Sequence, residues 1–208
     1  MGSTRPRRAR IVPAMPAGWR TTDEPPPGLR YVPDLLDAAE ERPLLAGLAA
    51  LPFREVVMRG VAARRTVVHF GWDYGYESWT LAPAPPLPPF LHGVRARAAA
   101  LAGVDPAAFA QVLVARYPPG AGIGWHRDAP MFGPIVVGVS LGGAAVMRFR
   151  RGRPGVRVLY RLPLAPRSGY VLAGAARAAW QHGLAPAPAL RYSITFRTLA
   201  RPAAQAKP

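Results

Sequence analysis

The stretch that decides the fold reads Ile135-Val136-Val137-Gly138-Val139-Ser140-Leu141-Gly142-Gly143, and it is followed closely by Ala145-Val146-Met147-Arg148-Phe149-Arg150. The first run is rich in β-branched residues, and a pair of glycines, which favour turns, separates it from the second run. Similar short runs cover residues 111–117, 156–162, 170–173 and 191–198, with glycine or proline between them. Many short strands at such spacing predict two packed sheets, as in a jelly roll.

The N-terminal half instead predicts helices. Asp34 is expected to be the N-cap of a first helix, which carries leucines between residues 35 and 48 toward the core, with a possible break at Pro43. A second helix is expected from Pro89 to Ala102, because a proline-rich connector precedes it and proline is well suited to a first helical position. Helices followed by many strands predict an α+β protein.

The length and composition predict one domain with two tails. The chain has 208 residues, 50% of them hydrophobic, which is enough for a sizeable core. Residues 1–30 are expected to form a mobile basic tail, residues 31–199 a single domain, and residues 200–208 a second tail.

Several classes of protein are excluded or disfavoured. The chain has no cysteine, so it has no disulfide framework and no thiolate metal site. Prolines break the short apolar segment after the first arginines, which argues against a signal peptide, and no apolar run reaches membrane-spanning length. We therefore expect a cytoplasmic protein without a membrane partner, and a monomer.

The net charge indicates a polyanionic partner. Basic residues number 27 and acidic residues 11, which gives a formal charge of +16. Basic surfaces bind phosphate backbones because they release counterions, so nucleic acid is the expected partner. The alternative is that a GC-rich genome imposes an arginine bias on any protein, since only Lys207 is a lysine.

The triplet His126-Arg127-Asp128 contains the only carboxylate between Phe109 and the C-terminus. On an extended strand, residues i and i+2 point to the same side, so His126 and Asp128 can reach one ion together. His182 is the only downstream histidine that can add a third ligand from another strand. Two histidines and one carboxylate form the ligand set of a non-haem Fe(II) site with open positions. The alternative for the triplet alone is a surface ion pair.

Two arginines lie on one face of the expected strand Arg191-Tyr192-Ser193-Ile194-Thr195-Phe196-Arg197. Guanidinium groups bind carboxylates bidentately, so this pair can hold a small dicarboxylate beside the metal. The alternative is a solvated strand face. Iron with a dicarboxylic 2-oxo acid is the equipment of a 2-oxoglutarate-dependent oxygenase.

Between about Phe53 and Leu199 the chain resembles the AlkB-like Fe(II)/2-oxoglutarate dioxygenases, and looks closest to a less characterised bacterial subgroup. The matching pieces, in the family's order, are Arg116-Tyr-Pro-Pro-Gly-Ala-Gly-Ile-Gly-Trp-His126-Arg-Asp128, Ile135 to Leu141, Trp180-Gln-His182 and Arg191 to Arg197. The resemblance implies a double-stranded β-helix, with His126, Asp128 and His182 as the catalytic iron ligands. It also implies that Arg191, Tyr117 and Arg197 bind 2-oxoglutarate.

Three positions depart from the best-known bacterial member of that family. Ala115 and Ser193 stand where it has asparagines beside the cosubstrate, so Ser193 is the residue left to contact 2-oxoglutarate there. Pro130 replaces an acidic residue that meets the alkylated base. These departures concern cosubstrate contacts and the substrate rather than the class of reaction.

Residues 53–80 are expected to form a substrate lid over a jelly roll of residues 109–199. The candidate substrate-binding residues in this lid are Arg64, Arg65, Trp72, Asp73, Tyr74, Tyr76 and Glu77. Arginines can follow phosphates while an aromatic ring stacks on an extruded base, and an acidic side chain can contact a cationic alkylated base. The alternative is a hairpin whose aromatic side chains pack on the core.

The resemblance implies an oxidative demethylase of N-alkylated bases in DNA or RNA, acting on a single strand or a flipped base. Such an enzyme uses Fe(II), 2-oxoglutarate and O2 and releases succinate, CO2 and formaldehyde. Two alternatives stay open: an oxygenase of the same fold that acts on a protein or small molecule, and a catalytically silent nucleic-acid-binding jelly roll.

Overall fold

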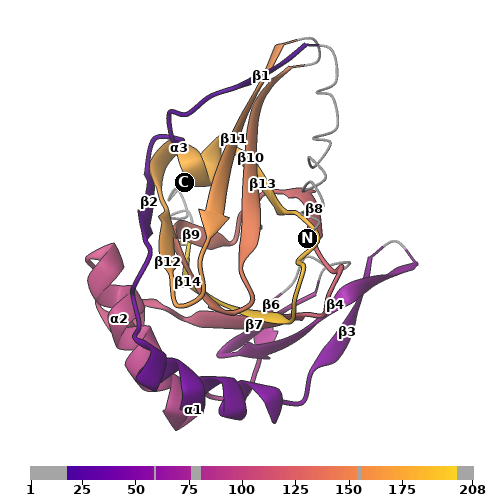
Figure 1. The fold of residues 1–208 in the computed structure, drawn as a ribbon. Helices are drawn as coiled ribbons and strands as arrows, with labels where there is room; N and C mark the ends of the chain where they lie inside the picture. Colours follow the sequence, from indigo (N-terminus) through magenta and orange to yellow (C-terminus); the bar gives the residue numbers. More distant parts are fainter. Residues whose placement is uncertain (1–17, 59, 76–80, 154–155, 201–208) are drawn as a thin grey trace, which may run out of the picture.

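The structure is a computed structural model that describes residues 18–58, 60–75, 81–153 and 156–200 (Figure 1). Most of its strands belong to two sheets. One sheet has seven strands in the order β2 (Leu29–Val32), β12 (Gly169–Leu172), β9 (Phe132–Gly142), β14 (Arg191–Leu199), β7 (Gln111–Tyr117), β4 (Val61–Phe70) and β3 (Arg54–Met58). The other has five strands in the order β1 (Trp19–Thr21), β11 (Val156–Leu164), β10 (Ala145–Arg153), β13 (Gln181–Leu184) and β8 (Ile123–His126).

The chain crosses repeatedly between the two sheets after β7, which confirms the predicted jelly roll. The antiparallel register places Arg191 opposite Tyr117, and His182 opposite His126. A small separate sheet pairs β5 (Trp72–Tyr74) with β6 (Leu81–Pro83). The fold therefore brings the C-terminal arginine strand beside the strand that ends in Tyr117.

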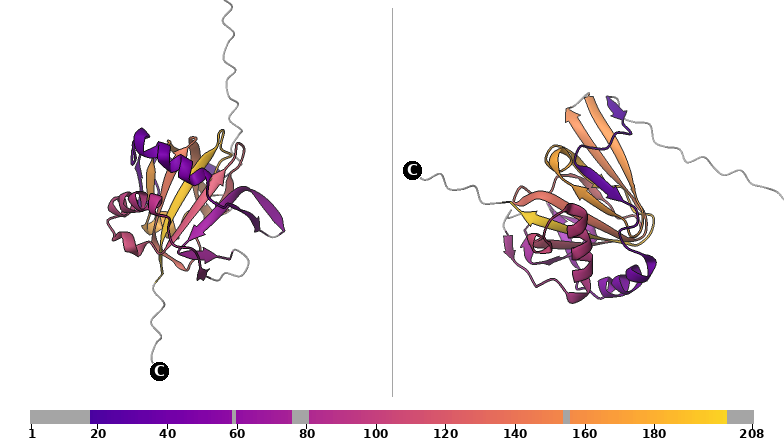
Figure 2. Two further views of the ribbon diagram at one scale, coloured as in Figure 1. Left: turned by 90° about the horizontal axis from the view of Figure 1, so that it is seen from below. Right: turned by 90° about the vertical axis from the view of Figure 1, so that its left-hand side faces the viewer.

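Two helices cover the outer face of the seven-stranded sheet (Figures 1 and 2). They are α1 (Ala38–Ala49) and α2 (His92–Ala102), and short 3-10 turns at Pro89–Leu91 and Pro106–Ala108 flank α2. Leu48, Leu91 and Val94 are buried there against β-branched residues of the sheet such as Val139 and Ile194. A short helix, α3 (Gly174–Ala178), connects β12 with β13.

The first helix begins later than the sequence pattern predicted. Its N-cap is Asp37, not Asp34, because Asp37 Oδ1 accepts a hydrogen bond from the Glu40 backbone N–H at 2.7 Å. Glu40 accepts one in return from the Asp37 backbone N–H at 2.9 Å, which completes a capping box. The helix continues through Pro43 without a break.

A second cluster of buried side chains fills the space between the two sheets. It includes Leu113, Met147, Phe149 and Tyr170. Gly138 on β9 makes room for the Tyr170 ring, because a Cβ there would lie 2.1 Å from Tyr170 Cζ. One end of this interior stays open as the cavity described below.

Two boundaries expected from composition were wrong. The N-terminal tail of residues 1–30 was drawn too long, because β1 pairs with β11 and β2 pairs with β12. The segment 53–80 is not only a cover, since β4 is an integral strand of the seven-stranded sheet, paired with β7. Residues 1–17 and 201–208 lie outside the described residues. Among the described residues, no helix is long and apolar enough to cross a membrane.

Candidate metal and 2-oxo acid site

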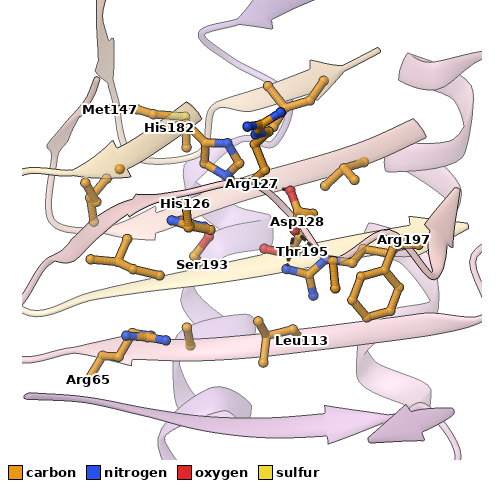
Figure 3. A pocket seen from close by; sticks show the side chains of 18 of the residues that line it. Arg65, Leu113, His126, Arg127, Asp128, Met147, His182, Ser193, Thr195 and Arg197 are labelled. Atoms are coloured by element: carbon orange, nitrogen blue, oxygen red, sulfur yellow. Dashed lines mark hydrogen bonds and ion pairs between the residues drawn. The ribbon is translucent and has the colours of Figure 1, made fainter. Parts of the chain in front are cut away.

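The two histidines of the predicted metal site lie side by side on neighbouring strands. His126 ends β8 and His182 lies in β13, and the register pairs them directly. Their ring centroids are 4.3 Å apart. Asp128 follows β8, and its Oδ2 lies 3.7 Å from His182 Nε2 (Figure 3). The structure thus brings the three residues of the sequence prediction together.

Arg197 holds the carboxylate of Asp128 from the opposite sheet. Its Nε and Nη2 atoms donate to Asp128 Oδ1 at 2.8 and 2.7 Å, and its Nη1 donates to Gln111 Oε1 at 2.9 Å. Burial raises the pKa of Asp128, but Arg197 and the neighbouring histidines outweigh burial and hold this pKa well below its usual range. Asp128 is therefore a carboxylate at any ordinary pH.

Both histidines are held in the neutral form. Burial lowers the pKa of His182 to about 3, and the nearby His126 adds to this effect. Burial also lowers the pKa of His126. His126 Nδ1 lies 2.9 Å from the Gly124 carbonyl oxygen, which can only accept a hydrogen bond, so Nδ1 carries the proton and Nε2 is left as a ligand atom.

The donor set fits a divalent cation. Asp128 Oδ2 and His182 Nδ1 are buried without a hydrogen-bond partner. Two neutral imidazoles and one carboxylate are the ligands that non-haem Fe(II) takes. Within the part of the chain that the structure describes, no three His, Asp or Glu side chains are arranged closely enough to hold a metal ion as they stand, because Asp128 is instead paired with the Arg197 guanidinium.

Arg191, at the start of β14, is almost fully buried with 2% of its surface exposed. Its Nη2 donates to Ser140 Oγ at 2.5 Å, and its guanidinium carbon lies 5.1 Å from the centroid of the Tyr117 ring. Its Nε has no partner. A buried cation without a counter-charge is costly, so this group is built to receive an anion. Ser193 lies on the same face of β14 and lines the same cavity.

These groups face one cavity of about 450 Å³ between the sheets. Its polar lining residues are Arg65, His69, Gln111, Tyr117, His126, Arg127, Asp128, Tyr170, His182, Arg191, Ser193, Thr195 and Arg197. Among the described lining residues, Asp128 is the only carboxylate. The cavity can therefore hold a cation at Asp128 and a dicarboxylate near the arginines.

The predicted substrate residues divide into three groups. Arg65 lines the cavity, whereas Arg64 points to the loop before β8, toward the carbonyl oxygens of Gly120 and Pro119 at 3.3 and 3.4 Å. Asp73 and Trp72 lie on β5 and are not among the cavity-lining residues. The Tyr74 side chain, Tyr76 and Glu77 lie outside the described residues.

Asp73 does not stand where a cationic base would need it. Its carboxylate pairs with His69 Nδ1 at 2.7 Å, and about half of its side chain, 49%, is exposed. His69 itself lines the cavity. The Asp73 carboxylate, which was expected to contact a cationic base, therefore contacts His69 in this structure.

Arg177 positions the loop that carries Asp128. It donates to the carbonyl oxygens of Asp128, Ala129 and Phe132 at 3.2, 3.0 and 2.9 Å. The sequence pattern did not point to Gln111 and Tyr170, because only the fold turns these side chains toward the cavity.

Comparisons with known proteins show the family to which the chain belongs. Residues 28–197 match the family model of the 2OG-Fe(II) oxygenase superfamily. The chain is 32% identical over 171 residues to the alpha-ketoglutarate-dependent dioxygenase AlkB of Escherichia coli, covering 70% of this chain and 77% of that protein. It is 31% identical over 179 residues to the "Alkylated DNA repair protein ALKBH8 homolog" of Arabidopsis thaliana, covering 75% of this chain but only 50% of that protein.

The fold is also similar to the solved structure of OsALKBH1, with a TM-score of 0.68 at 16% identity, over 84% of this chain and 98% of that one. Oxygenases of the matched superfamily use Fe(II), 2-oxoglutarate and O2. The chain belongs to the 2OG-Fe(II) oxygenase superfamily and, within it, to the AlkB-like dioxygenases.

Proposed function

We propose that this protein demethylates N-alkylated bases of nucleic acid oxidatively, and that it releases succinate, CO2 and formaldehyde. The observation that carries the nucleic-acid part is a cluster of arginines and tryptophans beside the cavity. The name of the Arabidopsis thaliana relative, an alkylated DNA repair protein, supports the same class of substrate.

This arginine–tryptophan cluster consists of Trp19, Trp125, Arg148, Arg150 and Arg157. Arg148 and Arg150 stack over the Trp125 ring, with guanidinium carbons 5.0 and 4.6 Å from its centroid. The Trp19 ring lies 6.3 Å from the Trp125 ring, and Arg157 stacks over Trp19 at 5.3 Å. Trp125 directly precedes His126 on β8, so the cluster lies on the outer side of the strand that carries His126.

The cluster lies on the outer face of the five-stranded sheet. Along β10, Met147 and Phe149 are buried toward the interior, and Arg148 and Arg150 alternate with them on the other side. Among the described residues, no acidic side chain pairs with Arg148, Arg150 or Arg157. Stacked guanidinium groups keep N–H edges for phosphate, and bases stack on indole rings, so this surface suits a single strand.

Within the cavity we assign Fe(II) to His126, Asp128 and His182. Arg191 would bind the distal carboxylate of 2-oxoglutarate, with Tyr117 and Ser193 beside it. Fe(II) bound there would supply the O2-dependent hydroxylation of the N-methyl group. The role of the protein is to hold the ligands, to keep Asp128 ionised through Arg197, and to place the methyl group in a cavity apart from bulk water.

The test is a single-turnover reaction in solution. The purified protein is loaded anaerobically with Fe(II) and 2-oxoglutarate, then mixed with O2 and a single-stranded oligonucleotide that carries one N-methylated base. We expect one formaldehyde and one succinate for each methyl group removed, and neither product from the Asp128→Ala variant. Succinate without formaldehyde from every methylated base would refute the demethylase and point to an oxygenase of proteins or small molecules. A lack of both products would point to a silent binding protein.

A further inference from the structure

Arg65 is a buried cation that the site described so far does not use. It lies on β4 and only 5% of its surface is exposed. It lines the cavity, yet no described residue forms a hydrogen bond or ion pair with its guanidinium. Burying a charge without a partner costs free energy, so such a group is retained where a ligand completes it.

The sheet register fixes where this guanidinium stands. β4 pairs with β7 so that Val67 lies opposite Ala115, and His69 opposite Leu113. Arg65 shares their face, two residues along, and therefore points into the interior from the seven-stranded sheet. His126 stands on the opposite sheet, across the cavity (Figure 3). A base whose methyl group approached His126 would lie between the two.

The charges of the cavity leave Arg65 without a counter-ion. Arg197 is paired with Asp128, and Arg191 is assigned to the cosubstrate. The Asp73 carboxylate is bound to His69, which lines the cavity. A base that carried its own positive charge would meet the Arg65 charge without a compensating carboxylate.

We propose that Arg65 donates hydrogen bonds to a carbonyl oxygen of the substrate base, and that this site selects neutral alkylated bases over cationic ones. The inference rests on the proposed function and names the substrate class of the same site. The neutral class comprises 3-methylthymine, 3-methyluracil and 1-methylguanine, which carry a carbonyl oxygen (O4 or O6) beside the methylated nitrogen where 3-methylcytosine and 1-methyladenine carry an amino group. The disfavoured class comprises 1-methyladenine and 3-methylcytosine, which are cations at neutral pH.

The decisive experiment compares 3-methylthymine with 3-methylcytosine at one position of the same single-stranded oligonucleotide. The kcat/KM ratio is measured for the iron-loaded enzyme. Binding is measured separately by fluorescence anisotropy with the metal-free protein and 2-oxoglutarate. We expect the parent protein to prefer 3-methylthymine at least about tenfold, equivalent to about 1.4 kcal/mol. Equal values, or a preference for 3-methylcytosine, would overturn the proposal.

Three variants separate the role of Arg65 from general effects. Arg65→Gln removes the charge and should abolish the preference, whereas Arg65→Lys keeps the charge and should retain most of it. Arg64→Gln is the matched control on the same strand, because Arg64 points to the loop carbonyls of Pro119 and Gly120, and it should leave the preference unchanged. Thermal unfolding verifies that each variant is folded.

A separate readout excludes a role in cosubstrate binding. If Arg65→Gln raised the KM for 2-oxoglutarate and left the base preference intact, Arg65 would belong to the cosubstrate site and the proposal would be wrong. If oligonucleotides bound with the expected preference but released no formaldehyde, recognition by Arg65 would stand and the demethylase would fall. The two proposals therefore fail in different measurements.

Discussion

Arg177 offers the sharpest test of how the fold positions Asp128. Arg177 lies in α3, and its side chain joins this helix to the loop that carries Asp128. It donates hydrogen bonds to the carbonyl oxygens of Asp128, Ala129 and Phe132 at 3.2, 3.0 and 2.9 Å. Asp128 and Phe132 are buried, with 8% and 4% of their surfaces exposed. An Arg177→Met variant keeps an unbranched stem but removes every one of these donors.

The expected cost follows from the bonds lost. A net contribution of about 1 kcal/mol for each hydrogen bond predicts a loss of about 3 kcal/mol, since water can replace the donors only in part. Arg127→Met is the control, because Arg127 is exposed and donates to one carbonyl oxygen, that of Ala178, at 3.3 Å. It should cost about 0.5 kcal/mol or less.

Urea unfolding of the metal-free proteins measures this difference, and Mn(II) titration of the folded variants measures whether the loop still presents Asp128. We expect Arg177→Met to lose stability and to bind Mn(II) at least about tenfold more weakly, equivalent to about 1.4 kcal/mol. If both variants matched the parent in stability and in Mn(II) affinity, the reasoning about the loop would be refuted.

Three further outcomes are expected. Gly138→Ala should destabilise the protein by about 1–3 kcal/mol, because the new Cβ would meet the Tyr170 ring at 2.1 Å. Gly93→Ala should stabilise the protein slightly, because the space around this position of α2 is open. Thermal unfolding compares the two variants, and equal effects on stability would contradict the packing around Gly138. Burial raises the pKa of Tyr170 above the ordinary value of 10.0, so its neutral form contributes fully below pH 10.0 and stability should fall as the pH rises further. Ultraviolet titration should show one late-ionising phenol that is missing in Tyr170→Phe, and its persistence there would count against this assignment. Arg148→Gln should reduce the slope of log affinity against log salt concentration for oligonucleotide binding by about one unit. Arg42→Gln, on the exposed face of α1, should leave this slope unchanged. Identical slopes for the two variants would exclude a phosphate contact at Arg148.

Local spacing made the shared direction of His126 and Asp128 predictable. His126 and Asp128 are two residues apart, so their shared direction follows from the geometry of an extended chain. Their approach to His182 could be named by elimination, since no other downstream histidine exists, but the register of β8 and β13 depends on the whole sheet. Arg197 was expected near the cosubstrate, and only the structure shows that it binds Asp128.

Long-range pairing set the limits of prediction. β1 is three residues long and pairs in parallel with β11, and the local sequence of Trp19–Thr21 does not predict this pairing. Whether Arg65 faces inward or outward depends on the pairing of β4 with β7, so the sequence could not choose between a lid and a core strand. The start of α1 could have been predicted correctly from the sequence, because Asp37 is followed by Glu40 at capping-box spacing. Asp34 has no Glu or Gln three residues later.

The measurement that tests the central claim most directly is an anaerobic titration of the metal-free protein with Fe(II) in the presence of 2-oxoglutarate. His126, Asp128 and His182 should bind one Fe(II) per chain, and Arg191→Gln should weaken 2-oxoglutarate binding while leaving Fe(II) binding in place. Asp128→Asn should lose Fe(II) binding, because the amide keeps the shape of the side chain but removes the negative charge. Undiminished binding of Fe(II) by Asp128→Asn would contradict the assignment of this site.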